Sequence, residues 1–351
     1  MVTSEQVARL AGVSRATVSR VLNGSAHVSA ETKKRIYMAM ATLGYRANVF
    51  SRAAPPHRTR MIALALFGSK DGLNLSQLTM TQCYFYLELL RFIEREVAKE
   101  GFDLFLPSHP YDMFDAGGDP GLNYVLALQA KRVEGVLTLA LRSDDPRIQG
   151  LCRSSIPAVF IDSFFQGEHA TYIKSDYMGG AGQAIEHLLR LGHRRIAFFP
   201  GDPFTVTGTE RLLGHQQAMA RAGLVVDPQL VRQTSWEAQD AYQAAMLLLS
   251  ERRDFTAIVA SSDMLATGVL RALRKHHIRV PEQMSVIGFD NIDLSQDTDP
   301  PLTTVQQNKQ AISEGAVARL LQLIRGEEAP APLVVSTKLI VRASTSSPPH
   351  Q

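Results

Sequence analysis

Residues 12–23 read GVSRATVSRVLN, and this stretch decides how the first part of the chain folds. Val18, Val21 and Leu22 recur at the spacing of one face of a helix, which predicts a short amphipathic helix. Ser14 stands just before that helix and can cap its first turn. The remaining positions carry arginine and hydroxyl side chains, so the stretch predicts a helix whose outer face is cationic and rich in hydroxyl groups.

Two further helices are predicted around this one. Thr3 can cap a helix whose third residue is Gln6, and Gly12 ends that helix. The helix that follows Ser14 then begins only about three residues later, which is the spacing of a helix-turn-helix. Ser29 caps a third helix that runs to Gly44, so the sequence predicts a small three-helix module.

The charge of the chain is divided unevenly. Residues 1–60 contain ten Lys or Arg and two Glu, a net charge of +8, whereas the remaining residues contain 27 basic and 32 acidic side chains, a net charge of −5. A basic module attached to a mildly acidic body is typical of proteins in which one end meets a polyanion. A solvated basic face without a partner is the alternative on charge alone.

The helix-turn-helix gives the basic face a specific use. The first residues of its second helix enter the DNA major groove, where arginine binds guanine and hydroxyl groups bind phosphates. We therefore predict that Arg15, Ala16 and Arg20 read bases and that Ser14, Thr17, Ser19 and Asn23 hold the backbone. The alternative is an ordinary capped surface helix with solvated arginines.

The stretch SEQVARLAGVSRATVSRVLNGSAHVSAETKKRI, followed by LGYRAN, resembles the DNA-binding headpiece of the LacI/GalR repressor family. This resemblance implies that residues 1–45 form the headpiece. It also implies further contacts with duplex DNA, to phosphates or where the headpiece meets the duplex, from Thr3, His27, Ser29, Thr32, Tyr45 and Asn48.

Residues 46–60, RANVFSRAAPPHRTR, are expected to form the hinge between headpiece and body. In the resembled family a leucine from this hinge wedges into the minor groove and kinks the operator. Ala54 occupies that position here, and Pro55 and Pro56 end any helix early. We therefore predict that this protein bends its operator less than its relatives do; a wedge from Phe50 is the weaker alternative.

From Met61 onward, short apolar runs alternate with amphipathic stretches. This alternation predicts parallel sheets covered by helices on both faces, and the strands are too many for one sheet, so two doubly wound lobes are expected. The predicted strands are 61–67, 102–106, 135–141, 158–162, 195–201, 257–262 and 285–290.

The body also resembles the effector-binding core of the LacI/GalR family, which is related to periplasmic sugar-binding proteins. The matching stretches include GGAGQAIEHLLRLGHRRIAFFPG, TGTERLLGHQQAM and SVIGFDN. The resemblance implies a core over residues 61–342 with three crossovers. Its N-terminal lobe is expected at 61–162 and 293–324, its C-terminal lobe at 163–290 and 325–342, and a flexible tail at 343–351.

Candidate effector-binding residues lie at the carboxyl ends of predicted strands, where open α/β sheets bind ligands. Carboxylates and hydroxyls there can hydrogen bond to a polyol, and Arg211 can bind an acidic group or hydroxyls. The candidates are Asp290, Arg211, Trp236, Asp162, Thr207, Ser262, Asp263, Gln307, Ser69 and Phe85. The alternatives are a structural salt bridge for Arg211 and Asp290, core packing for Trp236 and helix capping for Asp263.

Several classes of function lack support in the sequence. The glycines at 180 and 182 lack the third glycine of a dinucleotide motif, and no Walker A, GxSxG or HExxH motif occurs. Cys83 and Cys152 have no metal-ligand spacing, and no signal peptide or membrane span is predicted. We expect neither a cofactor nor catalysis.

The favoured interpretation is a cytoplasmic, nucleoid-associated homodimeric repressor. It would bind double-stranded operator DNA, respond to a small sugar-like effector and make no contact with a membrane. A sugar-sensing module with a vestigial headpiece and a carbohydrate-acting enzyme are the alternatives.

Overall fold

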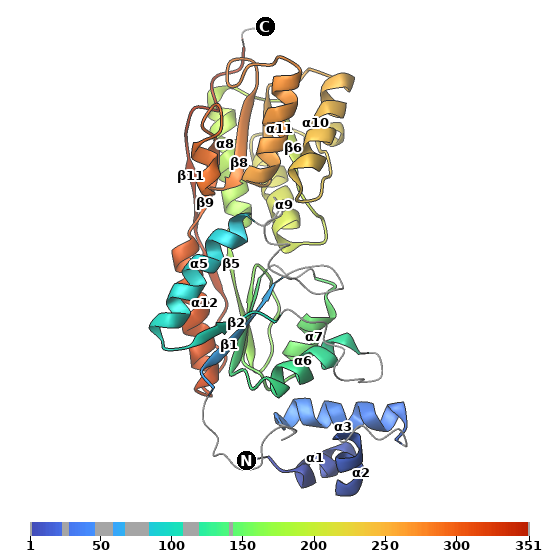
Figure 1. Cartoon of the computed structure of the whole chain (residues 1–351). Coiled ribbons are helices and arrows are strands. Elements are labelled where there is room, and N and C mark those ends of the chain that lie inside the picture. Colours follow the sequence, from blue (N-terminus) through green and yellow to red (C-terminus); the bar gives the residue numbers. More distant parts are fainter. Residues whose placement is uncertain are drawn as a thin grey trace. The chain divides into compact units, whose positions relative to one another are not determined.

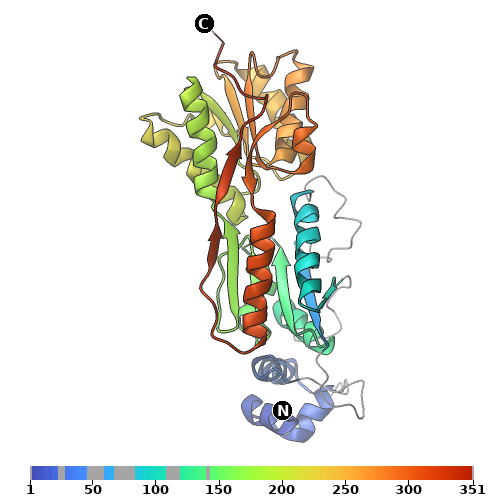
Figure 2. The same ribbon diagram turned by 90° about the vertical axis from the view of Figure 1, so that its left-hand side faces the viewer.

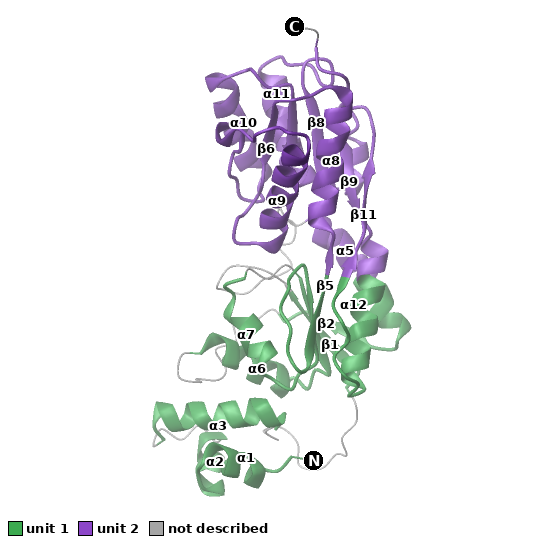
Figure 3. Ribbon diagram, turned by 180° about the vertical axis from the view of Figure 1, so that it is seen from behind, with its two compact units in different colours: residues 1–74, 93–173, 313–333 green, residues 75–92, 174–312, 334–351 purple. Residues whose placement is uncertain are grey.

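The computed structural model describes residues 2–22, 28–45, 59–66, 84–107, 119–139 and 143–349. The chain divides into two compact units (Figure 3). Unit 1 comprises residues 1–74, 93–173 and 313–333, and unit 2 comprises residues 75–92, 174–312 and 334–351. After residue 93 the chain therefore passes between the units three times, at 173/174, 312/313 and 333/334.

The headpiece contains the three predicted helices, α1 (Ser4–Ala11), α2 (Arg15–Leu22) and α3 (Ala30–Leu43). Thr3 and Gln6 form a reciprocal capping box, and Gly12 ends α1 with φ 64°, a left-handed conformation that glycine adopts without strain. The Oγ atom of Ser14 accepts a hydrogen bond from the amide of Thr17 at 3.2 Å. These local signals are the ones that the sequence predicted.

The apolar faces of the three helices form one small core. Val7, Val18 and Ile36 are fully buried in it. Leu10 lies three residues after Val7, a spacing that would put both on one helix face, yet Leu10 is 54% exposed. The buried face of α1 is centred on Val7, Ala8 and Ala11, which leaves Leu10 at its rim.

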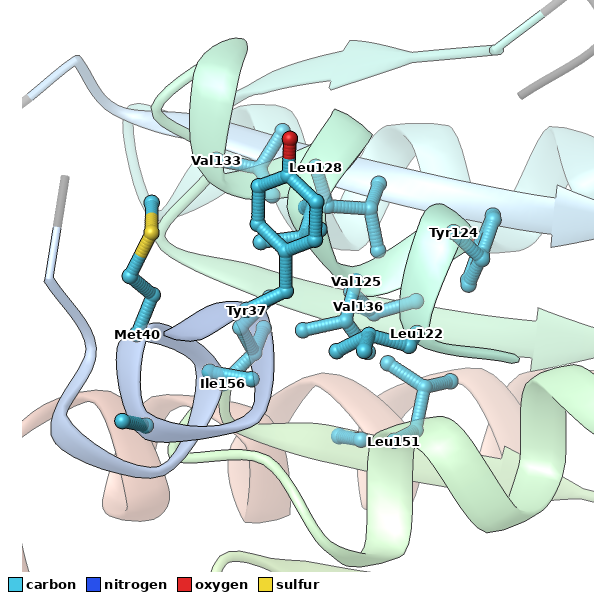
Figure 4. Packing of buried hydrophobic residues seen from close by; sticks show 14 of the residues in the cluster. Tyr37, Met40, Leu122, Tyr124, Val125, Leu128, Val133, Val136, Leu151 and Ile156 are labelled. Carbon is cyan, nitrogen blue, oxygen red and sulfur yellow. The ribbon is translucent and has the colours of Figure 1, made fainter. Parts of the chain in front are cut away.

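Helix α3 also packs against the α/β part of unit 1. Tyr37 and Met40 belong to the same buried cluster as residues of α6, such as Leu122 and Val125 (Figure 4). The Oγ atom of Ser155 donates a hydrogen bond to the carbonyl of Ala41 at 3.3 Å.

The sheet of unit 1 has six strands in the order β10-β5-β4-β3-β1-β2. From β5 to β2 the neighbouring strands are parallel. Helices α5 and α12 cover one face, and α6 and α7 cover the other (Figure 1). The strands are β1 (Met61–Leu66), β2 (Asp103–Phe105), β3 (Gly135–Leu139), β4 (Ala158–Ile161), β5 (Ala170–Ser175) and β10 (Leu333–Val335), and the helices are α5 (Tyr84–Lys99), α6 (Pro120–Ala130), α7 (Pro146–Cys152) and α12 (Lys309–Ile324).

The sheet of unit 2 has five strands in the order β11-β9-β8-β7-β6. All pairs are parallel except β11 with β9, which is antiparallel, and Figure 2 shows β11 beside β9. The strands are β6 (Ile196–Phe199), β7 (Ala257–Ala260), β8 (Ser285–Asp290), β9 (Thr303–Gln307) and β11 (Thr337–Ile340). The helices are α8 (Tyr177–Leu191), α9 (Val206–Arg221), α10 (Ala238–Glu251) and α11 (Asp263–Lys275), with short 3-10 helices at Pro228–Leu230 and Asp293–Gln296.

Side chains that alternate along these strands fill two separate cores. Phe199 packs with residues of α10 and α11, whereas its neighbour Phe198 packs with residues of α8 and α9. Successive side chains of a strand point to opposite faces, so a sheet covered on both faces needs continuous apolar runs. This explains the runs in the sequence, and the predicted class of two doubly wound lobes is confirmed.

The lobe boundaries differ from those implied by the sequence. Strand β5 pairs with β4 in the sheet of unit 1, so unit 1 continues to residue 173 instead of ending at 162. Strand β9 pairs with β8 and β11 in unit 2, so residues 293–312 belong to unit 2 and not to the N-terminal lobe. The crossovers at 173/174, 312/313 and 333/334 lie 11, about 20 and 9 residues beyond the boundaries that the resemblance implied.

The segment expected to be a flexible tail is hydrogen bonded to unit 2. Ser344 is fully buried; its Oγ donates to the carbonyl of Val286 at 2.6 Å and accepts from the amide of Thr303 at 2.8 Å. The carbonyl of Ser346 accepts a hydrogen bond from Nε2 of His193 at 2.8 Å. The expectation of a flexible tail is therefore wrong for residues 343–346, because their hydroxyl and backbone groups pair with strand ends.

Candidate DNA interface and candidate effector site

Helix α2 presents one apolar and one polar face. Val18 and Val21 are buried, whereas Arg15, Ser19 and Arg20 are exposed. At about 100° per residue, these two sets lie on opposite sides of the helix. The exposed face carries two guanidinium groups, and α2 contains no acidic residue. This arrangement suits a surface that contacts a polyanion.

The other predicted DNA contacts in the described headpiece are, apart from Ala16, polar side chains. Ser14 and Ala16 are exposed, and Thr17 is half-buried, with its hydroxyl 2.9 Å from that of Ser14. Ser29 caps α3 by accepting from the amide of Thr32 at 3.3 Å. Thr3 is exposed and Tyr45 is half-buried. The predicted contacts Asn23, His27, Asn48 and Ala54, the possible wedge Phe50 and the effector candidate Ser69 lie outside the described residues.

The candidate effector site in unit 2 is built around Arg211 of α9. This side chain is almost fully buried, and its Nη2 atom lies 3.2 Å from Oδ1 of Asp290. Its Nη1 atom donates to the carbonyl of Ser261. The guanidinium carbon lies 3.8 Å from the ring centre of Phe289 and 5.7 Å from that of Trp236. A buried cation held by a carboxylate, a carbonyl and aromatic rings has a fixed position and orientation.

Asp290 lies at the carboxyl end of β8 and connects the cation to two more side chains. Its Oδ1 atom also accepts from Nε2 of Gln307 at 2.7 Å, and Oε1 of Gln307 accepts from the hydroxyl of Ser175 at 2.7 Å. Asp290 has φ 114°, a conformation that non-glycine residues adopt only when their surroundings impose it. The sequence predicted Arg211, Asp290 and Gln307 in one site, and the structure brings these three together.

Trp236 is half-buried and stands directly against Gly201. Gly201 has φ 81°, and a Cβ atom added to it would come within 2.6 Å of the indole ring. Any residue with a Cβ atom at position 201 would therefore clash with the indole. The six-membered ring of the indole therefore lies against the backbone that follows β6, and the guanidinium of Arg211 is 5.7 Å from the ring centre.

The structure gives the remaining candidates of unit 2 partners within the fold. Ser262 caps α11 by accepting from the amide of Leu265 at 3.1 Å. The carboxylate of Asp263 accepts from the hydroxyl of Thr304 and from the amide of Ile292, and so braces the loop after β8. Its burial and the nearby charge of Asp290 raise the pKa of Asp263.

Thr207 donates to the hydroxyl of Thr205, and Phe85 is buried beneath the ammonium of Lys309.

Asp162 belongs to unit 1. It follows β4, is buried and has φ 63°, a second left-handed position occupied by an acidic residue at the carboxyl end of a strand.

Sequence reasoning missed two buried polar residues near this site, Ser175 and His215. His215 follows Arg211 by one helical turn and is fully buried. Among the described residues neither of its ring nitrogens has a hydrogen-bond partner, and burial lowers the pKa of His215 to about 4, so the imidazole is neutral. A polar residue four positions after Arg211 on a buried helix face was the available signal.

The arrangement is suited to binding. It offers a fixed cation, a carboxylate, an amide and an indole, which are groups that orient a polar ligand with apolar faces. Within the residues that the structure describes, no three His, Cys, Asp or Glu side chains gather as a metal site requires. No helix in the described ranges is both long and apolar enough to span a bilayer.

Comparison with known proteins identifies the family to which the headpiece and the body belong. The family model described as bacterial regulatory proteins, lacI family, matches residues 4–48, and that of a periplasmic binding protein-like domain matches residues 185–345. The regulator CelR of Thermobifida fusca is 33% identical over 348 residues, which cover 97% of this chain and 98% of CelR. The chain belongs to the LacI family. The repressor PurR of Pasteurella multocida is 29% identical over 349 residues, 99% of each chain.

Solved structures of other LacI-family proteins share this fold. A complex of CelR with cellobiose has a TM-score of 0.72 at 32% identity and covers 98% of this chain and 100% of CelR. A lac repressor dimer bound to operator and the anti-inducer ONPF has a TM-score of 0.67 at 27% identity and covers 98% of this chain and 99% of the repressor chain. This LacI-family chain is a transcriptional regulator, and the relatives are regulators, not enzymes.

Proposed function

We propose that this LacI-family protein represses transcription by binding operator DNA through α2, and that a sugar or sugar derivative bound at Arg211 and Asp290 controls its operator affinity. The observation that carries the effector part is the buried network of Arg211, Asp290 and Gln307 beneath the indole of Trp236. The observation that carries the DNA part is the exposed cationic face of α2.

The chemistry of the site favours a polyol. A carboxylate and an amide bind vicinal hydroxyl groups, a guanidinium binds hydroxyl or acidic groups, and a flat indole packs against the apolar face of a sugar ring. Cellobiose in the CelR structure is a ligand of this chemical class.

The geometry of α2 favours direct reading of bases. Arg15 and Arg20 are both exposed on α2, and Ser14 stands at the helix N-terminus, where the helix dipole favours a phosphate. Two headpieces in a homodimer would place two such helices on a near-palindromic operator about one helical turn apart. The lac repressor dimer on its operator supports this assembly. The protein would act in the cytoplasm, on the nucleoid, without a membrane partner.

The DNA part is tested by selecting duplexes from a random pool with the full chain. The selected duplex is then measured in mobility-shift titrations at two salt concentrations with competitor DNA. We expect binding that survives competitor. If competitor DNA removes the binding at both salt concentrations, the headpiece is only a nonspecific basic surface. That result would favour a sugar-sensing module with a vestigial headpiece.

The effector part is tested by thermal unfolding with a panel of mono- and disaccharides and sugar acids that includes cellobiose. A ligand that binds only the folded state raises the melting temperature. We expect at least one member to raise it for the native chain and not for Asp290→Asn. If no member shifts the native chain, the proposed effector class is wrong.

A further inference from the structure

After helix α5 the chain passes into unit 2 at Lys174 and Ser175, the last two residues of β5. Residues 170–173 of this strand pair with β4 in the sheet of unit 1. Lys174 and Ser175 lie beyond that pairing and already belong to unit 2. Consecutive side chains of a strand point in opposite directions, so these two residues can contact different parts of unit 2.

Ser175 contacts the acidic side of the effector site. Its hydroxyl donates to Oε1 of Gln307, and Nε2 of Gln307 donates to Oδ1 of Asp290, both at 2.7 Å. Ser175 and Gln307 are almost completely excluded from solvent, so water cannot replace either bond. An amide accepts at one end and donates at the other, so Gln307 satisfies both partners in only one orientation.

Lys174 contacts the residue that precedes Arg211 in α9. Its ammonium pairs with the carboxylate of Glu210, and both side chains are largely buried, 15% and 21% exposed. Glu210 immediately precedes Arg211 in α9, and Arg211 binds Asp290. Ser175 is therefore linked through Gln307 to Asp290. Its neighbour Lys174 binds Glu210, the residue next to Arg211 in sequence.

The same point of the chain is joined to another crossover. The amide of Asp176 donates to the carbonyl of Val335 at 2.8 Å, and the hydroxyl of Thr337 donates to the carbonyl of Asp176 at 3.1 Å. Val335 and Thr337 follow the crossover at 333/334. A displacement of Ser175 would therefore affect the chain at two of the three crossovers, those at 173/174 and 333/334.

We propose that Lys174 and Ser175 are positioning residues that transmit occupancy of the Asp290 site to the crossover strands. The proposal rests on the proposed function, because it takes the region around Asp290 as the place where the effector binds. Oδ1 of Asp290 already accepts from Arg211 and Gln307, so a ligand hydroxyl that binds this oxygen competes with Gln307 for its lone pairs. Gln307 must then shift or turn, and because it cannot keep both bonds in another orientation, the change reaches Ser175.

The deciding experiment is a double-mutant cycle read by amide hydrogen exchange on the full chain, without ligand or DNA. Exchange of the Asp176 amide is measured in the native chain, Asp290→Asn, Ser175→Ala and the double variant. We expect Asp290→Asn to speed exchange about fivefold in the native background and to add nothing in the Ser175→Ala background, since residues in one network are not additive. An equal effect in both backgrounds, or no effect in either, overturns the proposal.

Three variants keep this cycle interpretable. Gln307→Met removes the amide that links Ser175 to Asp290. It takes the place of Asp290→Asn in the cycle if Asp290→Asn does not fold. Ser175→Thr keeps the hydroxyl and should restore native exchange. Ser336→Ala, an exposed serine beside the crossover at 333/334, is the matched control and should leave the Asp176 amide unchanged.

A second readout separates this proposal from the proposed function. Cellobiose is the probe, and the duplex selected from the random pool is the DNA. We expect Lys174→Met/Ser175→Ala to keep the melting shift caused by the sugar and to lose most of the sugar-dependent change in duplex affinity. A change in duplex affinity that equals that of the native chain overturns the coupling. The absence of any sugar-induced shift counts against the proposed function and leaves the exchange result valid.

Discussion

The imidazole of His215 stacks on the phenyl ring of Phe198, with ring centroids 4.5 Å apart and ring planes inclined by 25°. Phe198 belongs to the core between the sheet of unit 2 and helices α8 and α9. An imidazole in such a place is held neutral, because burial disfavours the charged form. The pKa of His215 is accordingly lowered from 6.5 to about 4.

This relationship predicts how stability depends on pH. Below pH 6.5 the unfolded chain binds a proton at His215, whereas the folded chain does so only near pH 4. The contribution of neutral His215 to folding stability is therefore present above pH 6.5 and is lost as the pH falls toward 4. The difference corresponds to about 3 kcal/mol. We expect His215→Phe to flatten the fall in unfolding free energy between pH 7 and 4.5, measured by urea denaturation.

His277→Asn, which changes an exposed histidine, is the matched control and should leave the native slope in place. His187 and His193 retain part of the slope in every variant, because burial lowers the pKa of each. An unchanged slope in His215→Phe would show that position 215 does not contribute.

The second prediction concerns the bases that α2 reads. Arg15→Ala and Arg20→Ala should each weaken binding to the selected duplex by about 1–3 kcal/mol and relax the base preference at one position of each half-site. Mobility-shift titrations on selected and scrambled duplexes measure both effects. Arg221→Ala, an exposed arginine of unit 2, is the control. Discrimination that survives both headpiece changes would refute base reading by α2.

The third prediction concerns the buried ion pair. Asp290→Asn leaves Arg211 buried without its carboxylate partner, so we expect a loss of about 3–5 kcal/mol in unfolding free energy together with the loss of sugar binding. The double variant Arg211→Met/Asp290→Leu removes both charges. It should regain most of the stability and still bind no sugar; sugar binding by this variant would place the effector elsewhere.

The fourth prediction concerns the segment that follows β11. Ser344→Ala removes one hydroxyl that serves both the carbonyl of Val286 and the amide of Thr303, and leaves these two buried groups unsatisfied. We expect a loss of about 1–3 kcal/mol by urea denaturation. Ser347→Ala, at an exposed serine three residues later, should cost almost nothing. Equal stability of the two variants would contradict the docking of this segment.

The fifth prediction concerns Ala54 and stays a prediction from sequence, because this residue lies outside the described ranges. A methyl side chain fills little of an opened base step, so the native protein should bend its operator weakly, and Ala54→Leu should increase the bend. Gel phasing of the selected duplex measures both. A strong central kink with the native chain would contradict the prediction.

Local signals and long-range pairings differed in how well the sequence predicted them. The bounds of the headpiece helices follow from caps at Thr3, Ser14 and Ser29 and from left-handed glycines, all of which act within four residues. Seven strands follow from apolar runs, whereas β5, β10 and β11 were not among the predicted strands. The crossovers were misplaced, because the pairing of β5 with β4 and of β9 with β8 decides to which unit β5 and β9 belong, and no single residue marks that pairing.

The polar interior was the least predictable part. Arg211, Asp290 and Gln307 were identified from strand ends and from the family resemblance. Ser175 carries no local signal of burial, and His215 carries only its spacing of four residues from Arg211. The hydroxyls of the last residues suggested a solvated tail until their backbone partners were known. Such residues become visible only when segments far apart in the sequence lie side by side.

The position of Trp236 has a practical consequence. It is the only tryptophan in the chain, and its indole stands between Gly201 and the guanidinium of Arg211. Intrinsic fluorescence excited at the indole band therefore originates from the candidate effector site alone. Titration of the unlabelled protein with a sugar would report changes around Trp236 through its fluorescence. The measurement needs no extrinsic dye and has no background from other tryptophans.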